Sequence, residues 1–155
     1  MSLTLHLGVV DVAYSDASSS SSGAKTTGDV AEILEANYHV MQTFFELNKE
    51  KVARALADSM AASIQRLINT GERIDERASL TAGADAKIET AFRAFIFSNE
   101  MSRLHFALTG QALVAAAAAG VNHRLKHPCA KKNKPRPAFV DTGLYVSSFR
   151  AWVEK

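Results

Sequence analysis

Residues 29–71 read DVAEILEANYHVMQTFFELNKEKVARALADSMAASIQRLINTG, and this stretch decides the fold because its apolar residues recur at helical spacing throughout. Asp29 is suited to cap the first turn, with Glu32 three residues later as in a loose capping box. Gly71 supplies a stop after the last apolar residues. The spacing predicts a long amphipathic helix whose apolar stripe comprises Val30, Ile33, Leu34, Met41, Phe44, Phe45, Val52, Leu56, Met60, Ile64, Leu67 and Ile68.

An unbroken helix of about 40 residues would be on the order of 60 Å long, since each residue adds about 1.5 Å. This length is large for a chain of 155 residues. The helix therefore either breaks near Asn48 or forms a rod that projects toward neighbouring subunits. In both cases the apolar stripe requires a partner surface or an antiparallel return helix.

Extended structure is predicted for residues 1–14, where the leucines of SLTLHLGVV alternate with polar residues. This segment is an N-terminal strand or arm. Residues 15–28, SDASSSSSGAKTTG, hold almost no apolar side chain, so ordering them would cost entropy without hydrophobic gain. We expect a flexible serine-rich loop there.

Residues 29–126 are predicted to form a helical body. Within it, residues 72–83 have the composition of a connector, and helical periodicity resumes over residues 85–98. The alanine-rich stretch favours a further helix over residues 111–126. Three prolines then exclude regular helix, so residues 127–138 are predicted to form a loop.

The C-terminal residues 139–155 are predicted to form a turn and a strand. Asp141, Thr142 and Gly143 favour a structural turn, and beyond them apolar and polar residues alternate in FRAWVE. The natural partner of this strand is the N-terminal one. The predicted fold class is therefore α+β: long amphipathic helices packed with a small sheet formed by the terminal strands, in one domain that spans residues 1–155.

The net charge of +2 conceals an uneven distribution of charged residues. Residues 1–119 hold 10 basic and 14 acidic side chains, whereas residues 120–140 hold six basic side chains and no acidic one. A concentrated positive field attracts acidic partners, although a solvated basic loop is the alternative. The six residues, predicted to face DNA or a protein interface, are Arg124, Lys126, Lys131, Lys132, Lys134 and Arg136.

The cysteine content points to a reducing compartment, or at least to a fold that needs no disulfide. The single cysteine, Cys129, cannot form an internal disulfide. The first apolar residues lack the basic flank and cleavage site of a signal peptide, and the run at 112–119 is too short to span a bilayer. We expect a soluble protein with no contact with a membrane.

Motifs of catalysis are absent from the sequence, and we expect no enzyme activity, no cofactor and no metal. The best metal candidates are His123, His127 and Cys129, but the neighbouring lysines repel a cation and no fourth ligand is evident. A Cys-His nucleophile would need an orienting acid that this region lacks. Two histidines in apolar surroundings, His39 and His105, and the phenylalanines Phe44, Phe45, Phe92, Phe95 and Phe97 are predicted to belong to the core.

Nucleic-acid binding is the second function that the composition favours. The six clustered cations could release phosphate counterions and give affinity for DNA that depends on salt but not on base sequence. No recognition module surrounds them. A small DNA-binding or DNA-packaging accessory protein is therefore the alternative hypothesis.

The C-terminal run GVNHRLKHPCAKKNKPRPAFVDTGLYVSSFRAW, residues 120–152, resembles the corresponding part of small structural proteins of tailed bacteriophages. These are the neck, head-tail joining and tail-completion proteins, in which a basic stretch precedes a Thr-Gly turn and an amphipathic strand. GDVAEILE, residues 28–35, is similar to phage neck proteins as well. The residues that match the C-terminal pattern are Pro137, Phe139, Asp141, Thr142, Gly143, Leu144, Ser148 and Phe149.

The resemblance implies a structural virion protein that forms a homo-oligomeric ring at the head-tail junction. Its expected neighbours are portal, adaptor or other neck proteins on one side and tail terminator, tube or sheath proteins on the other. Genomic DNA passes through such a ring, so non-specific contact with DNA is expected too. The implied location is the virion, with the host cytoplasm during assembly.

Overall fold

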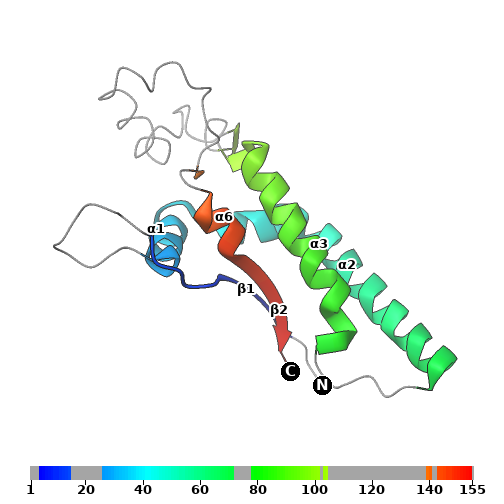
Figure 1. Ribbon diagram of the computed structural model, residues 1–155. Coiled ribbons are helices and arrows are strands. Elements are labelled where there is room, and N and C mark those ends of the chain that lie inside the picture. Colours follow the sequence, from blue (N-terminus) through cyan, green and yellow to red (C-terminus); the bar gives the residue numbers. More distant parts are fainter. Residues whose placement is uncertain are drawn as a thin grey trace, which may run out of the picture. The chain divides into compact units, whose positions relative to one another are not determined.

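The computed structural model describes residues 4–14, 26–71, 78–101, 103–104, 139–140 and 143–154. This part of the chain is mostly helical and holds one two-stranded antiparallel sheet (Figure 1), which confirms the predicted α+β class. The elements are β1 (Thr4–Val9), α1 (Thr27–Tyr38), α2 (Val40–Thr70), α3 (Ala78–Phe97), α6 (Leu144–Ser148) and β2 (Phe149–Glu154).

The chain divides into two compact units. The first comprises Met1–Ala91 together with Ser148–Lys155, and the second comprises Phe92–Ser147. Helices α3 and α6 each run from one unit into the other. The terminal sheet and the long helix α2 therefore belong to the same unit.

The two terminal strands pair with each other, as the alternation of their residues predicted. β1 and β2 are antiparallel, and their register runs from Thr4 opposite Glu154 to Val9 opposite Phe149. One further backbone bond, from the Val10 N–H to the Ser148 carbonyl at 2.8 Å, continues the pairing past the end of β1. The first and last segments of the sequence thus form one element of the fold.

The long helix breaks at His39, nine residues before the predicted position at Asn48. His39 adopts the left-handed conformation, with φ 50°, and its N–H donates to the Glu35 carbonyl to end α1. The carboxylate of Glu35 then accepts the N–H groups of Met41 and Gln42 at 2.8 and 3.1 Å. Because Glu35 satisfies the first amides of α2, the chain can restart a helix directly after the break.

Two predictions about this region were therefore wrong. His39 is exposed at the helix junction and is not a core histidine. Asn48 is buried within α2, where its side-chain amide donates to the Phe44 carbonyl at 3.0 Å. An asparagine bonded to the preceding turn satisfies its own polarity and leaves the helix continuous.

Helix α1 begins two residues before the predicted start, so the serine-rich segment does not extend to residue 28. Thr26 is the N-cap and Asp29 is the third residue of the helix: the Thr26 hydroxyl accepts the Asp29 N–H at 3.2 Å, and the Asp29 carboxylate accepts the Thr26 N–H at 2.9 Å. The capping box is therefore formed by Thr26 and Asp29 instead of Asp29 and Glu32. At the other end, Gly71 caps α2 in the left-handed conformation, as predicted.

Helix α3 begins at Ala78, inside the stretch predicted to be a connector. Residues 78–83 contain three helix-favouring side chains, Ala78, Leu80 and Ala82, and a single glycine at Gly83 weakens a helix without ending it. A Cβ atom at Gly83 would lie 3.5 Å from Oγ of Ser59 in α2. This distance is an ordinary van der Waals contact, so α3 lies against α2 here and a larger side chain would still fit.

The core of the first unit lies where α2, α3 and β2 meet. Phe44 of α2 and Phe149 of β2 are fully buried, and their rings meet edge to face with centroids 6.3 Å apart. Further buried residues come from α2, α3 and β2: Val40, Asn48, Val52, Ala55, Ser59, Thr81, Ala84, Ile88 and Ala151.

The second unit has its own aromatic contact. The ring of Phe92 meets Tyr145 of α6 with centroids 6.2 Å apart and planes at 72°. Phe92 and Phe95 are buried, which together with Phe44 confirms three of the five phenylalanines predicted as core. The core prediction was wrong for Phe45 and Phe97, which are 36% and 54% exposed. Each of them follows a buried residue on a helix and therefore points away from the core.

The pair Phe44 and Phe45 offers a test of this core. We expect Phe44→Ala to lower the free energy of unfolding by about 3–5 kcal/mol, because it removes a fully buried ring that contacts Phe149. The neighbouring change Phe45→Ala, at a partly exposed site in the same helix, should cost about 1 kcal/mol. Urea unfolding followed by circular dichroism measures both, and equal losses would contradict the assignment of the core face.

Candidate interaction surfaces

Most of the residues predicted to act in binding lie outside the part of the chain that the structure describes. This holds for all six basic residues, Arg124, Lys126, Lys131, Lys132, Lys134 and Arg136, and for Asp141 and Thr142 of the predicted turn. The metal candidates His123, His127 and Cys129, the histidine His105 and the predicted helix over 111–126 lie outside it as well. Gly143 is the one predicted site residue that is described.

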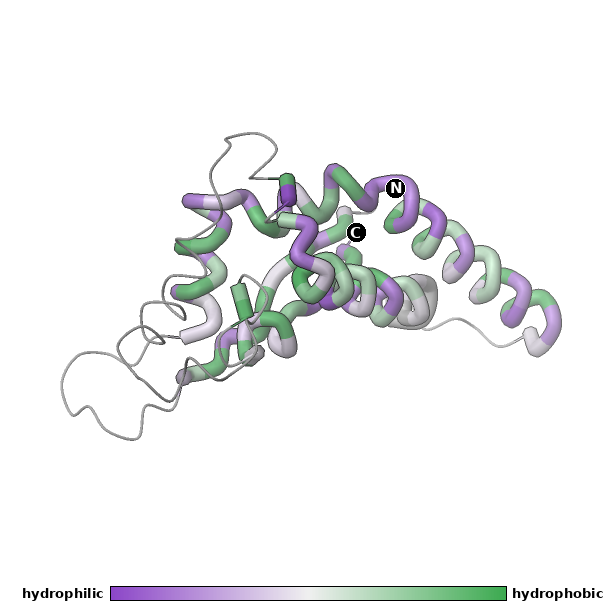
Figure 2. Tube along the Cα trace, turned by 90° about the horizontal axis from the view of Figure 1, so that it is seen from above, coloured by the Kyte–Doolittle hydropathy of each residue, from purple (hydrophilic) through white to green (hydrophobic). Residues whose placement is uncertain are grey.

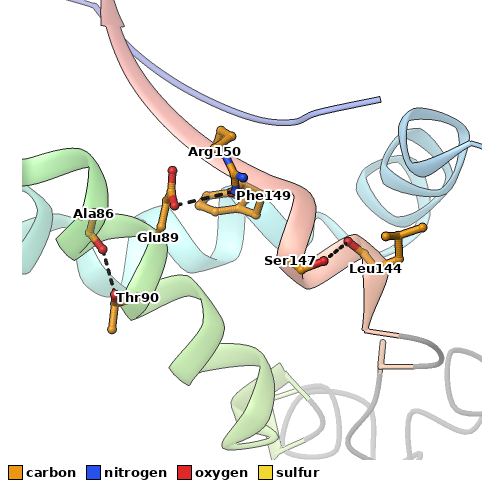
Figure 3. A network of polar contacts seen from close by, with 7 residues as sticks. All are labelled: Ala86, Glu89, Thr90, Leu144, Ser147, Phe149 and Arg150. Atoms are coloured by element: carbon orange, nitrogen blue, oxygen red, sulfur yellow. Dashed lines mark hydrogen bonds and ion pairs between the residues drawn. The ribbon is translucent and has the colours of Figure 1, made fainter. Parts of the chain in front are cut away.

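Gly143 is the last residue of the predicted turn, and it is the one of the three that the structure describes. Its φ of 81° is left-handed, a conformation that costs other residues about 1–2 kcal/mol. Its carbonyl accepts the Ser147 N–H at 3.0 Å, and the Ser147 hydroxyl donates to the Leu144 carbonyl at 2.9 Å (Figure 3). The glycine therefore begins the short helix α6, which runs directly into β2.

The outer part of the terminal sheet carries an aromatic surface that sequence reasoning missed. Trp152 is 40% exposed, and its ring stacks on His6 with centroids 5.4 Å apart and planes at 12°. Nε2 of His6 lies 3.4 Å from the Glu154 carboxylate. Gly8 leaves room for the indole, since a Cβ atom there would lie 3.0 Å from Trp152. The strand register places His6 opposite Trp152, so knowledge of this register would have been needed to predict the contact.

An acidic pair on α3 faces the start of β2. Figure 3 shows the ion pair between Glu89 and Arg150, whose charged atoms lie 3.8 Å apart. Asp85 precedes Glu89 by one helical turn. Partial burial raises the pKa of Asp85, and the nearby negative charge of Glu89 raises it further. Since Arg150 pairs with Glu89, this part of the arrangement is an ion pair that joins α3 to β2.

The N-terminal segment is fixed to the start of α1 by polar contacts. The Asp11 carboxylate accepts a hydrogen bond from the Thr26 side chain and the Gly28 N–H at 2.9 Å, and both bonds lower the pKa of Asp11. The Thr27 hydroxyl donates to the Val10 carbonyl at 2.6 Å and accepts the Val12 N–H at 2.8 Å. A carboxylate at a helix N-terminus is also favoured by the helix dipole. Asp11 itself therefore occupies this anion-binding position.

The last third of α2 exposes a series of large apolar side chains. Ile64, Leu67 and Ile68 are 48%, 38% and 71% exposed. Figure 2 shows hydrophobic and hydrophilic residues alternating along these final turns of the helix. Exposed apolar residues gathered on one helix are typical of surfaces that bind another protein.

Two kinds of site are not found among the described residues. No three of their histidine, acidic or cysteine side chains are grouped so as to hold a metal ion. None of the described helices combines the length and the apolar content that crossing a bilayer requires.

Comparison with family models, with curated proteins and with solved structures gives no match for this chain.

The turn at Gly143 can be tested by substitution. We expect Gly143→Ala to destabilise the protein by about 1 kcal/mol through left-handed strain alone, because a Cβ atom there would meet nothing within 4 Å. Gly143→Asn should cost less, since asparagine tolerates this conformation. Gly83→Ala is the control. Gly83 lies within α3, where an added Cβ atom would make only an ordinary contact, so this change should stabilise the protein by about 0.5–1 kcal/mol. Thermal unfolding measures all three, and a neutral Gly143→Ala would contradict the turn.

Proposed function

We propose that this chain is a non-enzymatic structural virion protein of a tailed bacteriophage, which forms a ring in the neck at the head-tail junction as a head-tail connector or tail-completion protein. The observation that carries the proposal is the C-terminal pattern, in which a basic stretch leads through a Thr-Gly turn into an amphipathic strand. The left-handed Gly143, the short helix α6 and the strand β2 are compatible with that pattern.

The fold offers surfaces that suit a ring subunit. In a closed ring each subunit presents one surface to a different surface of the next, so two dissimilar contact regions are needed. The described sheet has only two strands, which leaves one edge of each strand available for a neighbour's extended segment. Portal, adaptor or other neck proteins on the head side, and tail terminator, tube or sheath proteins on the tail side, are the proposed partners.

The basic segment has a proposed role in the same ring. Its six cations, with no acid between residues 120 and 140, would be neutralised by the phosphates of DNA passing through the ring or by an acidic face of a neighbouring protein. Neither contact requires base recognition. The proposed location is the virion neck or tail, reached from the host cytoplasm during assembly.

Inactivating the gene in the phage that encodes the chain tests this function. We expect filled heads and separate tails in the lysate, because the joint between them is missing, and a loss of infectious particles of at least about 100-fold. A plasmid copy of the wild-type gene should restore joining, whereas a frameshifted copy should not. Electron microscopy of the lysates reads the result, and normal numbers of tailed infectious particles in the absence of the gene would refute the proposal.

The concentrated positive charge favours a second candidate, a DNA-binding or DNA-packaging accessory protein. For this candidate, replacing Lys131, Lys132 and Lys134 with glutamine should reduce the dependence of log K on log salt by about 3, one for each lost phosphate contact. The matched control replaces Lys49, Lys51 and Lys87, three exposed lysines of α2 and α3. Fluorescence anisotropy with duplex DNA measures the slopes, and equal effects of the two triple variants would exclude a DNA site in the basic segment.

A further inference from the structure

Helix α2 has two apolar faces, and only one of them is used by the described fold. The buried residues of α2 run from Val40 to Ser59 along one side. A second set runs from Ala53 to Gly71, and at about 100° per residue it points about 150° away from the first. This second face does not extend the core, because it lies on the opposite side of the helix.

The second face has the regular spacing of a helix-packing seam. Its positions are separated by four, three, four, three and four residues, which is the 3.5-residue period of coiled coils. None of them is charged, and none is buried: the alanines and Gly71 are exposed, Met60 is half-buried, and Ile64 and Leu67 are 48% and 38% exposed. We name this set the outer seam; it consists of Ala53, Ala57, Met60, Ile64, Leu67 and Gly71.

We propose that the outer seam is a homodimer interface, in which α2 packs antiparallel against α2 of a second copy of this chain. The spacing of the seam reads the same in both directions, so a two-fold axis near residue 62 brings every seam position opposite another. Ala53 then faces Gly71 of the second copy, Ala57 faces Leu67, and Met60 faces Ile64.

The sizes of the seam residues fit this antiparallel register. The seam has small side chains at Ala53 and Ala57, large ones at Met60, Ile64 and Leu67, and none at Gly71. Reversing one helix places Leu67 against Ala57, so that a large side chain fills the space left by a small one. The central layer then joins two large side chains, Met60 and Ile64, and the helices approach most closely at the outer layers of Ala53 and Gly71. A parallel pair would place Leu67 against Leu67 and Ala57 against Ala57, which leaves the two ends of the interface unequal in width.

Charge also excludes the parallel arrangement. Glu46 and Glu50 occupy the two positions that precede Ala53 at the seam spacing. A parallel pair would bring each glutamate against its own copy, and like charges at seam positions repel. In the antiparallel register these glutamates lie past Gly71 of the second copy, where its α2 has ended. The slip of seven residues that brings Leu67 opposite Glu50 is disfavoured too, because it would place a charge against an apolar side chain.

This pair goes beyond the proposed ring and does not rest on it. A two-fold contact closes on itself, so it describes the free protein, whereas a ring uses a contact between dissimilar surfaces. The pair keeps the apolar turns of α2 out of water before assembly. It is tested on the purified protein alone, so its failure and the failure of the head-tail function give separate results.

Sedimentation equilibrium of the purified full chain tests the pair. The wild type is expected to be a dimer at micromolar concentration. Leu67→Asp should raise the dissociation constant at least 100-fold, because it places a charge opposite Ala57 in the seam. Asn69→Asp is the matched control: it adds the same charge to the same exposed last turn of α2, off the seam, and should leave the mass unchanged.

Exchange of the two facing residues is a stricter test of the register. Leu67→Ala should raise the dissociation constant at least tenfold by leaving a gap, and Ala57→Leu should weaken the pair by overpacking. The double variant A57L/L67A restores one large and one small residue in each layer and should recover the wild-type constant within about threefold. A double variant weaker than both single ones overturns the register.

Disulfide trapping tests the orientation. Ala61 lies beside the seam at the level of the two-fold axis, and Ala62 lies at the same level on the far side; both are exposed. In a Cys129→Ser background, which removes the only native cysteine, Ala61→Cys should form a disulfide dimer on oxidation and Ala62→Cys should not. Cross-linking of Ala53→Cys to itself indicates a parallel pair and overturns the proposal.

A wild type that stays monomeric at about 100 µM also overturns the pair. If Leu67→Asp, but not Asn69→Asp, then abolishes head-tail joining in the phage, the seam binds another virion protein instead of a second copy. A mass unchanged by Leu67→Asp excludes the seam as the dimer contact.

Discussion

The contact between Phe44 and Phe149 is the interaction on which the first unit depends. A two-stranded sheet has little stability alone in water, because it leaves one of its faces without a hydrophobic partner. Here the first residue of β2 is fully buried and meets a fully buried ring of α2 edge to face. The sheet therefore owes its stability to the helix, and β1 is held through its pairing with β2.

This dependence explains why so much of the local chemistry secures the chain ends. The Val10 N–H bonds to the carbonyl just before β2, and Asp11 bonds to the first turn of α1. The N-terminal segment thus connects the sheet to the helical body through two consecutive residues. At the other terminus, the left-handed Gly143 precedes α6, and α6 runs into β2 without a linker. Both ends of the sequence are placed by hydrogen bonds near the strands themselves.

Periodicity predicted the elements well, but the junctions between them depended on single side chains. The terminal strands, the stop at Gly71 and the α+β class followed from alternation and spacing. The break at His39 did not, because it requires Glu35 to accept two amides of the next helix, a contact that no spacing rule contains. The start of α1 was misplaced because Thr26 and Asp29 form a capping box as good in sequence as the one expected three residues later.

Features of the candidate surfaces that depend on the local sequence could be predicted, whereas contacts between distant parts of the chain could not. Gly143 is left-handed, a conformation that depends on the local backbone and that glycine adopts without strain, so a short motif can indicate it. The stack of His6 on Trp152 joins residues from opposite ends of the chain, so it becomes visible only once the strand register is known. The two faces of α2 were merged into one stripe, because spacings of three and four are satisfied by either face.

The alanine content of α2 connects its stability with its second face. Helices gain most of their stability from packing, and turns without such packing must rely on intrinsic propensity. Beyond Ser59 no residue of α2 is buried, yet the helix continues to Thr70. Between Ala53 and Ala62 half of the residues are alanine, the strongest helix former. These alanines favour the helix up to and just past the turn where its buried face ends, whereas the turns from Ser63 to Thr70 contain no alanine. In the proposed pair, the small side chains of Ala53 and Ala57 leave the space that a second helix needs for close approach.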